Sequence, residues 1–502
     1  MKSIYIYIKT PLKELLWVLA IVLIAATGCK KYLDIPLPVN KIAGEGAYTN
    51  DKSSAATINN ILGNFSTQGY FDGSATNNLC FFTGLYTDEL QNLNITFANQ
   101  NLYYTNAINA GNTGGLWSNL YKQIYNANLT IEGVTTSNTL TYKNQWLGEA
   151  YFIRAFCFFY LANYYGDVVI TSSSDYLMNK DLPRVAKTEA YKLITADLLK
   201  AKELLSNEYK DGNGLSTTGR GRPNKFTAAA LLARTYLYTE DWSNAEIQAN
   251  DVITATINGA SAYTLLPPSD IDKVFLSASK ETIFNLGSTR INQDYVIYNN
   301  NMPAIVDYNA GGNWGSVNVA ISPMLISVFE KNSTTLADDL RKTYWIRSAT
   351  MKASTTNPVI PAQIKYFPNK YKSSVVGAEN IVLFRLAEQY LIRAEARARR
   401  NNLDGAKADL DMIRIRAGLN GTNAVGQTDM INAIIRERRV ELFTESSHRF
   451  LDLKRTSTID AVMNLVVTQK GNGATWNPLK QNFPIPVNDI LANPKLRQTE
   501  GY

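Results

Sequence analysis

The sequence predicts a mainly α-helical protein, built from helical hairpins with irregular loops and short strands inserted between them. Two observations predict this class. Apolar residues recur at three- and four-residue steps through 383–417, so that they fall on two helices joined by a short turn. The same pattern, with the same spacing of small residues, returns at 224–254. The chain has 502 residues, 45% of them hydrophobic, which is enough to bury a large core under such helices.

The hairpin at 383–417 is the clearest of these elements. Its turn is predicted by the Asn-Asn-Leu-Asp-Gly sequence at 401–405. A further helix is predicted from Ile431 to about Phe443. One face of the first helix is formed by Leu383, Leu386, Ala387, Tyr390, Leu391, Ala394 and Ala398. The second helix contributes Ala406, Leu410, Ile413 and Ala417.

The stretch 224–254 repeats this hairpin. Ala233 and Ala245 stand twelve positions apart, as Ala394 and Ala406 do, and small residues at these points allow paired helices to approach closely. Hairpins of about 34 residues with this pattern have the period of tetratricopeptide repeats. Because the copies are separated in the sequence, we expect an interrupted array.

The remaining chain divides into helical and irregular stretches. Amphipathic or apolar patterns predict helices at 41–62, 117–134, 143–165 and 188–205, and a short helix and loop after Ser457. Residues 63–115 and 256–375 are rich in Asn, Gly and aromatic residues, and predict loops and short strands. The sequence therefore suggests a signal peptide at 1–28, an N-terminal helical region at 29–255, an irregular insertion at 256–375 and a C-terminal region at 376–502.

The N-terminus has the pattern of an exported lipoprotein. Three lysines within the first 14 residues precede an apolar run at 15–27, which is shorter than a comfortable membrane span. Small residues lead directly to Cys29, which we interpret as the acylated residue of a lipid anchor. The alternatives are a plain signal peptide, or an uncleaved anchor with an incidental cysteine.

Composition argues against several classes of function. The formal net charge of +7 is spread along the chain and gives no indication of nucleic-acid binding. One His and three Cys make a metal site improbable, and we expect neither metal nor cofactor. Cys80 and Cys157 are expected to be buried thiols, although pairing between them stays open.

Charged residues on the apolar helices are candidates for catalysis or for packing. Two carboxylates can form an acid/base pair, but a buried carboxylate also needs a partner of opposite charge. Glu441 and Glu445 lie one turn apart amid Arg438, Arg439 and Arg449, which favours ion pairing. His448 has no nucleophile at a recognisable spacing, so we interpret it as an incidental helix-end residue. The same structural interpretation covers Glu149, Arg154, Glu388, Glu395, Arg449 and Asp452.

Aromatic and amide side chains in the irregular stretches are the better candidates for ligand binding. A sugar ring stacks on an aromatic face, and its hydroxyls need amide partners. Such residues are dense around 65–110 and 290–320. We therefore expect ligand contacts from Tyr70, Phe71, Asn94, Tyr103, Tyr295, Tyr298, Asn313 and Trp314.

Six segments in order resemble the SusD/RagB family of outer-membrane lipoproteins from Bacteroidetes. A departure is Ser447, where the family usually has Gly before His-Arg. The segments are 29–34 (CKKYLD), 149–168 (EAYFIRAF through YGDV), 229–242 (with LLARTYLY), 385–419 (RLAE through RAGL), 437–455 (ERRVEL through LKR) and 483–502 (FPIP to the terminal GY).

The resemblance implies a tetratricopeptide-like scaffold with irregular insertions. It also implies a surface lipoprotein of the outer membrane that captures glycan and passes it to a SusC-like TonB-dependent transporter, without catalysis. Alternatives are the same scaffold capturing peptide or another nutrient, a surface glycoside hydrolase, and a scaffold that binds only protein.

Overall fold

The computed structural model describes residues 46–67, 79–112, 115–287, 305–306, 319–353, 361–373, 375–471 and 473–502. The chain separates into two compact units, 1–47 and 48–502, and the second contains every helix and strand discussed below. The expected divisions near 255 and 375 therefore fall inside one compact unit. Within the described residues, no helix combines the length and apolarity needed to cross a membrane.

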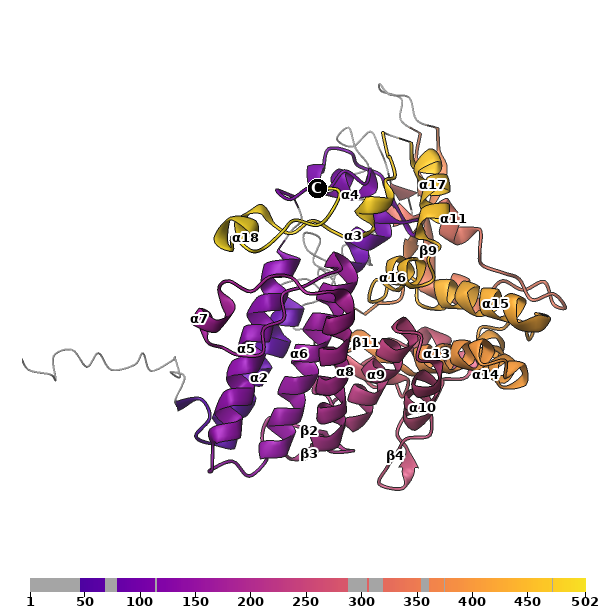
Figure 1. Ribbon diagram of the computed structural model, residues 1–502. Helices are drawn as coiled ribbons and strands as arrows, with labels where there is room; N and C mark the ends of the chain where they lie inside the picture. The colour runs from indigo at the N-terminus through magenta and orange to yellow at the C-terminus, as the bar shows by residue number, and fades with distance from the viewer. Residues whose placement is uncertain are drawn as a thin grey trace, which may run out of the picture. The chain divides into compact units, whose positions relative to one another are not determined.

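Helices of residues 48–502 form an array in which each packs on the next (Figure 1). The chain order is interrupted between α10 and α13, but the two helices are neighbours in space. The expected interruption therefore lies in the sequence and not in the packing. The members of the array are α2 (Asp51–Thr67), α5 (Leu116–Thr136), α6 (Lys143–Tyr165), α8 (Lys187–Leu204), α9 (Lys225–Tyr238), α10 (Trp242–Ile253), α13 (Leu386–Arg399), α14 (Leu403–Arg416) and α15 (Gly426–Glu441).

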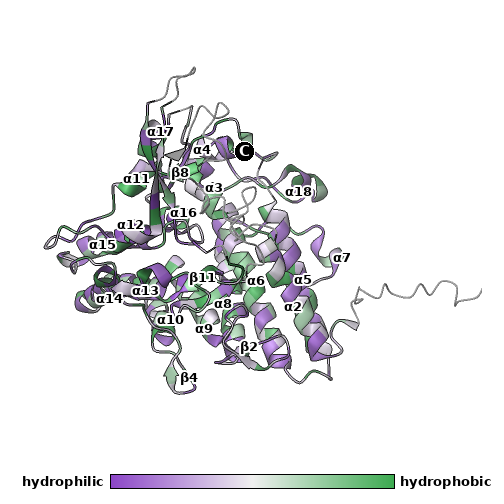
Figure 2. Cartoon of the chain, turned by 180° about the vertical axis from the view of Figure 1, so that it is seen from behind, coloured by the Kyte–Doolittle hydropathy of each residue, from purple (hydrophilic) through white to green (hydrophobic). Residues whose placement is uncertain are grey.

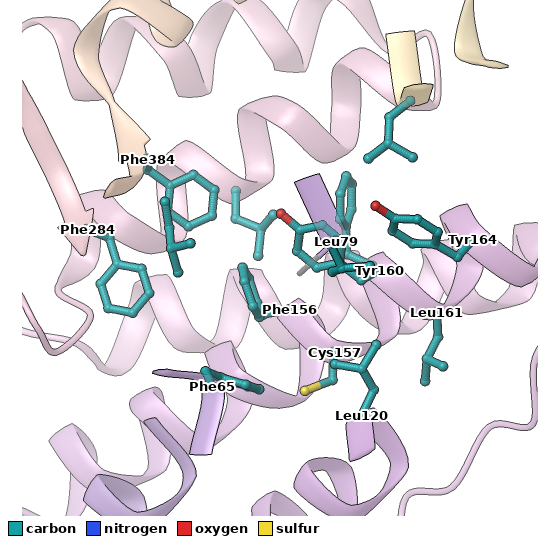
Figure 3. Close-up of a cluster of buried hydrophobic side chains, with 14 of the residues drawn as sticks. Phe65, Leu79, Leu120, Phe156, Cys157, Tyr160, Leu161, Tyr164, Phe284 and Phe384 are labelled. Atoms are coloured by element: carbon teal, nitrogen blue, oxygen red, sulfur yellow. The ribbon is translucent and has the colours of Figure 1, made fainter. Parts of the chain in front are cut away.

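Helix α6 occupies the middle of the core. It packs against both α5 and α8, so nearly all of its side chains are buried, and its sequence is apolar on every side. Phe156 and Cys157 lie in this core, and Phe156 faces Phe384 at 6.2 Å between ring centroids (Figure 3). In contrast, α2 and α5 carry bands of hydrophobic and hydrophilic residues (Figure 2).

Strand β11 (Ile381–Arg385) corrects the start of the predicted hairpin. It pairs antiparallel with β6 (Thr282–Leu286), and α13 begins only at Leu386. Leu383 is therefore a strand residue and not part of a helix face. The run Ile-Val-Leu-Phe suits a strand buried on both faces, and its pairing with a distant segment overrides the apparent helical spacing.

The stretch 63–115 is more helical than predicted. It contains α3 (Leu79–Tyr86) and α4 (Ala98–Tyr104) as well as the short strand β1 (Leu90–Asn92). All eight residues of α3 are buried, so its sequence has no polar face from which a helical period can be recognised. Helix α2 (Asp51–Thr67) lies largely within the stretch 41–62, which confirms the helix predicted there.

The irregular insertion contributes small sheets. Strand β1 pairs antiparallel with β8 (Val319–Ile321). Strand β9 (Ile346–Met351) lies between β10 (Gln363–Pro368) and β7 (Ile305–Val306). The other short elements are α7 (Tyr176–Asn179), β2 (Tyr209–Lys210), β3 (Ser216–Thr217), β4 (Thr256–Ile257), β5 (Ala260–Ser261), η3 (Pro268–Lys273), α11 (Pro323–Ile326), α12 (Leu340–Trp345), α16 (His448–Arg455), α17 (Ile459–Lys470), η4 (Pro478–Gln481) and α18 (Val487–Ala492).

Candidate functional site

The charged residues of the helices form ion pairs, as the structural interpretation predicts. Each pair joins different elements, and most of the side chains involved are buried. This confirms a packing role for the residues that were weighed as catalytic candidates. The pairs are Arg222–Glu149 (2.5 Å), Arg154–Asp197 (2.8 Å), Arg234–Glu388 (2.7 Å), Arg455–Glu395 (2.7 Å), Arg438–Asp452 (2.9 Å) and Arg449–Asp88 (2.8 Å).

Glu441 is the centre of the largest ion-pair network. Its carboxylate accepts from Arg341 at 3.0 Å, and also from Arg385 and Arg416. Burial alone would raise the pKa of Glu441, but these guanidiniums outweigh it and hold the pKa well below its usual range. The arginine neighbours predicted from the sequence were wrong, because the actual partners come from β11, α12 and α14. A carboxylate held this way is a poor general acid.

Ser447 lies in the turn before α16, and His448 is the first residue of that helix, which confirms its predicted place at a helix end. His448 is only 4% exposed, with Nε2 3.9 Å from a Glu388 oxygen, so it is a packed core residue and not an incidental one. Burial lowers its pKa well below the usual range, and nearby arginines lower it further. Ser447 has φ of 59°, the left-handed conformation that favours Gly, which explains why a Gly suits this position.

Cys80 and Cys157 are buried thiols that form no disulfide, as expected. Burial raises the pKa of Cys80 to about 12, so it stays protonated. Among the residues that the structure describes, no cluster of His, Cys, Asp and Glu has the composition of a metal site.

Two of the predicted ligand residues lie in the described part of the chain. Tyr103 is 4% exposed and stacks on Phe82 at 4.3 Å between ring centroids, so its ring belongs to the core and offers no open face to a sugar. Asn94 is also buried, and its Oδ1 accepts from the backbone N–H of Thr96 at 3.0 Å and from its hydroxyl at 2.6 Å. These contacts give Asn94 a role in shaping the turn. The other predicted positions, Cys29, Tyr70, Phe71, Tyr295, Tyr298, Asn313 and Trp314, lie outside the described residues.

The turn after β1 exposes residues that the sequence reasoning passed over. Ile95 is 62% exposed and Phe97 is 46% exposed, although both are large and apolar. Asn92 and Asn101 are linked across this turn, with Nδ2 to Oδ1 at 3.4 Å. No pattern in the sequence indicated them, because large apolar residues are expected to be buried and their exposure is set by the turn.

Pairing between β1 and β8 joins the two stretches in which ligand residues were predicted. Leu90 pairs with Ile321 and Asn92 with Val319, so the first stretch is hydrogen-bonded to the end of the second. Strand β10 contacts β8, and Lys365 Nζ on β10 donates to Gln91 Oε1 on β1 at 2.8 Å. We call the turn 93–97 together with β1, β8, β9 and β10 the strand face.

The strand face has a solvent-exposed side made of aromatic, aliphatic and hydroxyl groups. On β9 and β10, Tyr366 lies opposite Ser348, and Ile364 lies opposite Thr350. Ser348, Thr350 and Ile364 are exposed and Tyr366 is half-buried, whereas the alternate residues Ala349, Met351 and Phe367 are buried. The sequence QIKYFP does not show this alternation, because Ile364 and Tyr366 are apolar and yet lie on the exposed side, so a period of two alone would not have assigned that side.

Comparison with known proteins agrees with the architecture. Residues 292–502 match the SusD family, and residues 47–237 match the family described as starch-binding, associating with outer membrane. SusD-like protein P2 of Formosa agariphila is 25% identical over 530 residues, covering 96% of this chain and 98% of the relative.

Solved structures are similar in fold. A SusD-like protein of Bacteroides fragilis superposes with a TM-score of 0.72 at 20% identity, covering 91% of this chain and 98% of that one. A laminarin-binding SusD-like protein superposes with a TM-score of 0.68 at 21% identity, covering 91% and 100%. The helical scaffold, the ordered sequence segments and both family matches lead to one conclusion: the chain belongs to the SusD/RagB family.

Proposed function

We propose that the protein is a non-catalytic lipoprotein, anchored to the outer membrane through Cys29 and exposed at the cell surface, that binds glycan and delivers it to a SusC-like TonB-dependent transporter. The observation that carries the ligand-binding part is the β1–β8 pairing, since it joins the two stretches rich in aromatic and amide residues. A laminarin-binding protein of similar fold and the starch-binding description of the family support a glycan as the ligand.

The strand face offers suitable chemistry for sugars. Phe97 in the turn 93–97 and Tyr366 on β10 each present an aromatic ring, and the C–H face of a pyranose packs on such a ring. Ser348 and Thr350 supply hydroxyls that donate to or accept from sugar hydroxyls. We further propose that Tyr70, Phe71, Tyr295, Tyr298, Asn313 and Trp314 add contacts to a ligand held beside this face.

A glycan screen followed by calorimetry tests this function. The chain without its first 29 residues, which keeps the whole unit 48–502, is screened on a polysaccharide panel that includes laminarin. Phe97→Ala, Trp314→Ala and Tyr298→Ala are then titrated with the tightest ligand. Each is expected to weaken binding roughly tenfold, because one aromatic stacking contact contributes about 0.5–1.5 kcal/mol beyond its buried area.

Tyr176→Ala is the matched control, since Tyr176 is 72% exposed but lies on α7. Wild-type affinity in Phe97→Ala, Trp314→Ala and Tyr298→Ala would remove these three residues from the site. If no glycan of the panel binds and the protein captures peptides instead, the nutrient is a peptide and not a glycan. Release of reducing ends by the purified protein would contradict the non-catalytic assignment.

The anchor and the transporter are tested separately. Cells labelled with an alkyne-tagged fatty acid should incorporate it into the wild-type protein and not into Cys29→Ala. Affinity purification of the wild-type protein from outer membranes is expected to retain a TonB-dependent transporter. Label in the Cys29→Ala protein would contradict lipidation at this residue, and purification without a transporter would contradict the delivery step.

A further inference from the structure

A groove lies on the helical array and is formed by residues that are not part of the strand face. It has a volume of about 690 Å³ and runs along α8, where the C-terminal end of α9 meets it. One wall is a stripe of α8 residues spaced by three or four, which extends for about 18 Å at 1.5 Å per residue. The lining residues are Lys187, Thr188, Tyr191, Lys192, Thr195, Ala196, Leu199, Tyr238 and Thr239.

The charged residues that line the groove are all cationic. Lys192 pairs with Glu189 at 2.7 Å on the outer surface, so its charge is balanced there. Lys187 differs, because its ammonium has no ion pair or hydrogen bond within the part of the chain that the structure describes. Its Nζ lies 5.6 Å from the centroid of the Tyr191 ring, and its burial lowers its pKa to about 8. Lys187 therefore places an unbalanced, partly desolvated positive charge at one end of the groove.

Lys187 is also the first residue of α8, where the positive end of the helix dipole lies. Asp167 Oδ1 accepts from the backbone N–H of Lys187 at 3.0 Å, so its carboxylate offsets this dipole. Lys454 does not reinforce the positive charge, because burial lowers its pKa well below its usual range and favours its neutral form. The Lys187 ammonium is therefore the group at this end of the groove whose complement is an anion.

The rest of the groove is mostly apolar, with hydroxyls from Thr188, Thr195 and Thr239. Tyr191 and Tyr238 supply aromatic rings, and Ala196 and Leu199 supply aliphatic surface, with Leu199 47% exposed. A peptide laid along this stripe would bring backbone N–H and C=O groups against side chains with few hydrogen-bonding partners, which is costly. A hydrocarbon chain has no such groups to satisfy.

We propose that the α8 groove binds an anionic amphiphile, an alkyl chain that follows the stripe toward Leu199 with a terminal carboxylate beside Lys187. This site is separate from the glycan-binding function and does not depend on it. The amphiphile is recognised by one point charge and by apolar contact. Both chain length and head-group charge should therefore set its affinity.

Calorimetric titration of the chain without its first 29 residues tests the site, with n-decanoate, n-hexanoate and decan-1-ol as probes. Decanoate is expected to bind, and each methylene removed toward hexanoate should weaken binding about fourfold. Lys187→Met should weaken decanoate binding about tenfold and leave decan-1-ol binding unchanged, because only the carboxylate uses the ammonium. Leu199→Asp should weaken the binding of both probes.

Lys200→Met is the matched control, since Lys200 is on the same helix but pairs with Glu203 at 3.0 Å outside the groove. Far-ultraviolet circular dichroism checks that each variant is folded. Equal decanoate affinity in wild type and Lys187→Met would overturn the proposal, as would no binding of decanoate at all. An apolar peptide with a free carboxylate that binds more tightly than decanoate would overturn the assignment to an alkyl ligand.

Discussion

The hairpins α9–α10 and α13–α14 have the same construction and different surroundings. In both, small residues lie where the helices touch, and Ala233, Ala245, Ala394 and Ala406 are fully buried. The first hairpin contributes one buried arginine, Arg234, whose partner Glu388 lies on α13. The second hairpin and the strand before it contribute Arg385, Arg414 and Arg416, which enter the network around Glu441.

This difference shows that the charged residues of the second hairpin connect it to the irregular insertion. Its arginines reach residues supplied by the irregular insertion, among them Glu281 and Glu330, and Arg341 from the same insertion reaches Glu437 and Glu441. The first hairpin is held by apolar packing, whereas the second is also the attachment point of the insertion. A buried ion pair adds little net stability over well-packed apolar groups, but breaking one is costly. The network therefore fixes which segments meet.

The largest effect is expected from Glu441→Gln. The substitution keeps the volume of the side chain but leaves three buried guanidiniums without their shared counter-charge, so the free energy of unfolding should fall by about 3–5 kcal/mol. Urea denaturation measures it. Glu246→Gln is the control on the first hairpin, where Glu246 pairs with the more exposed Arg397 and Arg400, and about 1 kcal/mol or less is expected. Equal losses would remove the distinction between the hairpins.

The Arg234–Glu388 pair links the two hairpins and is tested by a double-mutant cycle. Arg234→Met or Glu388→Met alone should each cost about 3 kcal/mol, since each leaves one buried charge unpaired. The double variant should lie within about 1 kcal/mol of wild type, because methionines replace both charges. If the two single losses simply add in the double variant, the pair does not act as a unit.

Glu89 lies at the junction between α3 and the end of α15, and it should make the free energy of unfolding depend on pH. Burial, and then the negative charge of Asp88, raise its pKa to about 7 from an ordinary value near 4.5. The folded state therefore holds the proton more tightly than the unfolded state. Its contribution to stability is full below pH 4.5 and is lost as the pH rises through 7, by about 2–3 kcal/mol.

Glu89→Gln should remove this dependence, since the amide does not titrate. Urea denaturation of both proteins at pH 4.5, 6 and 7.5 measures the difference in the free energy of unfolding. A difference that stays constant with pH would show that Glu89 titrates normally in the folded protein.

The smallest effect is expected in the turn after α15. Ser447 has φ of 59°, a conformation that costs an L-residue about 1–2 kcal/mol relative to the right-handed region. Ser447→Gly should therefore stabilise the protein by up to about 1 kcal/mol, part of the gain being offset by the greater freedom of Gly in the unfolded chain. Ser137→Gly, at φ of −69°, should destabilise it slightly. Thermal denaturation of both variants distinguishes conformational strain from a general effect of Gly.

The sequence was sufficient for the features that are local. The period of apolar residues predicted the array helices and both hairpins, because amphipathic helices repeat their pattern every few residues. It did not predict α3, whose residues are all buried, or the start of α13, where β6 pairs with the preceding strand. The partners of Glu441 were also missed, since Arg341 reaches it from a segment one hundred positions away.

The sequence predicted the candidate site only as two stretches of suitable composition, and not as individual contact residues. Aromatic and amide residues indicated two stretches, but Tyr103 is packed in the core and Asn94 shapes a turn. Exposure depends on which side of a short strand or helix a residue occupies, and that side is set by pairing with distant segments. Phe97 and Tyr366 emerged only from the arrangement of β1, β8 and β10.

The β1–β8 pairing also has a consequence for the order of folding. Its partners, Leu90 and Ile321, are ~230 residues apart in the chain, so closing this loop costs far more chain entropy than forming a helical hairpin. The helical hairpins consist of local contacts and should form first. The strand face should acquire protection from hydrogen exchange last during refolding, and should lose it first under mild denaturant.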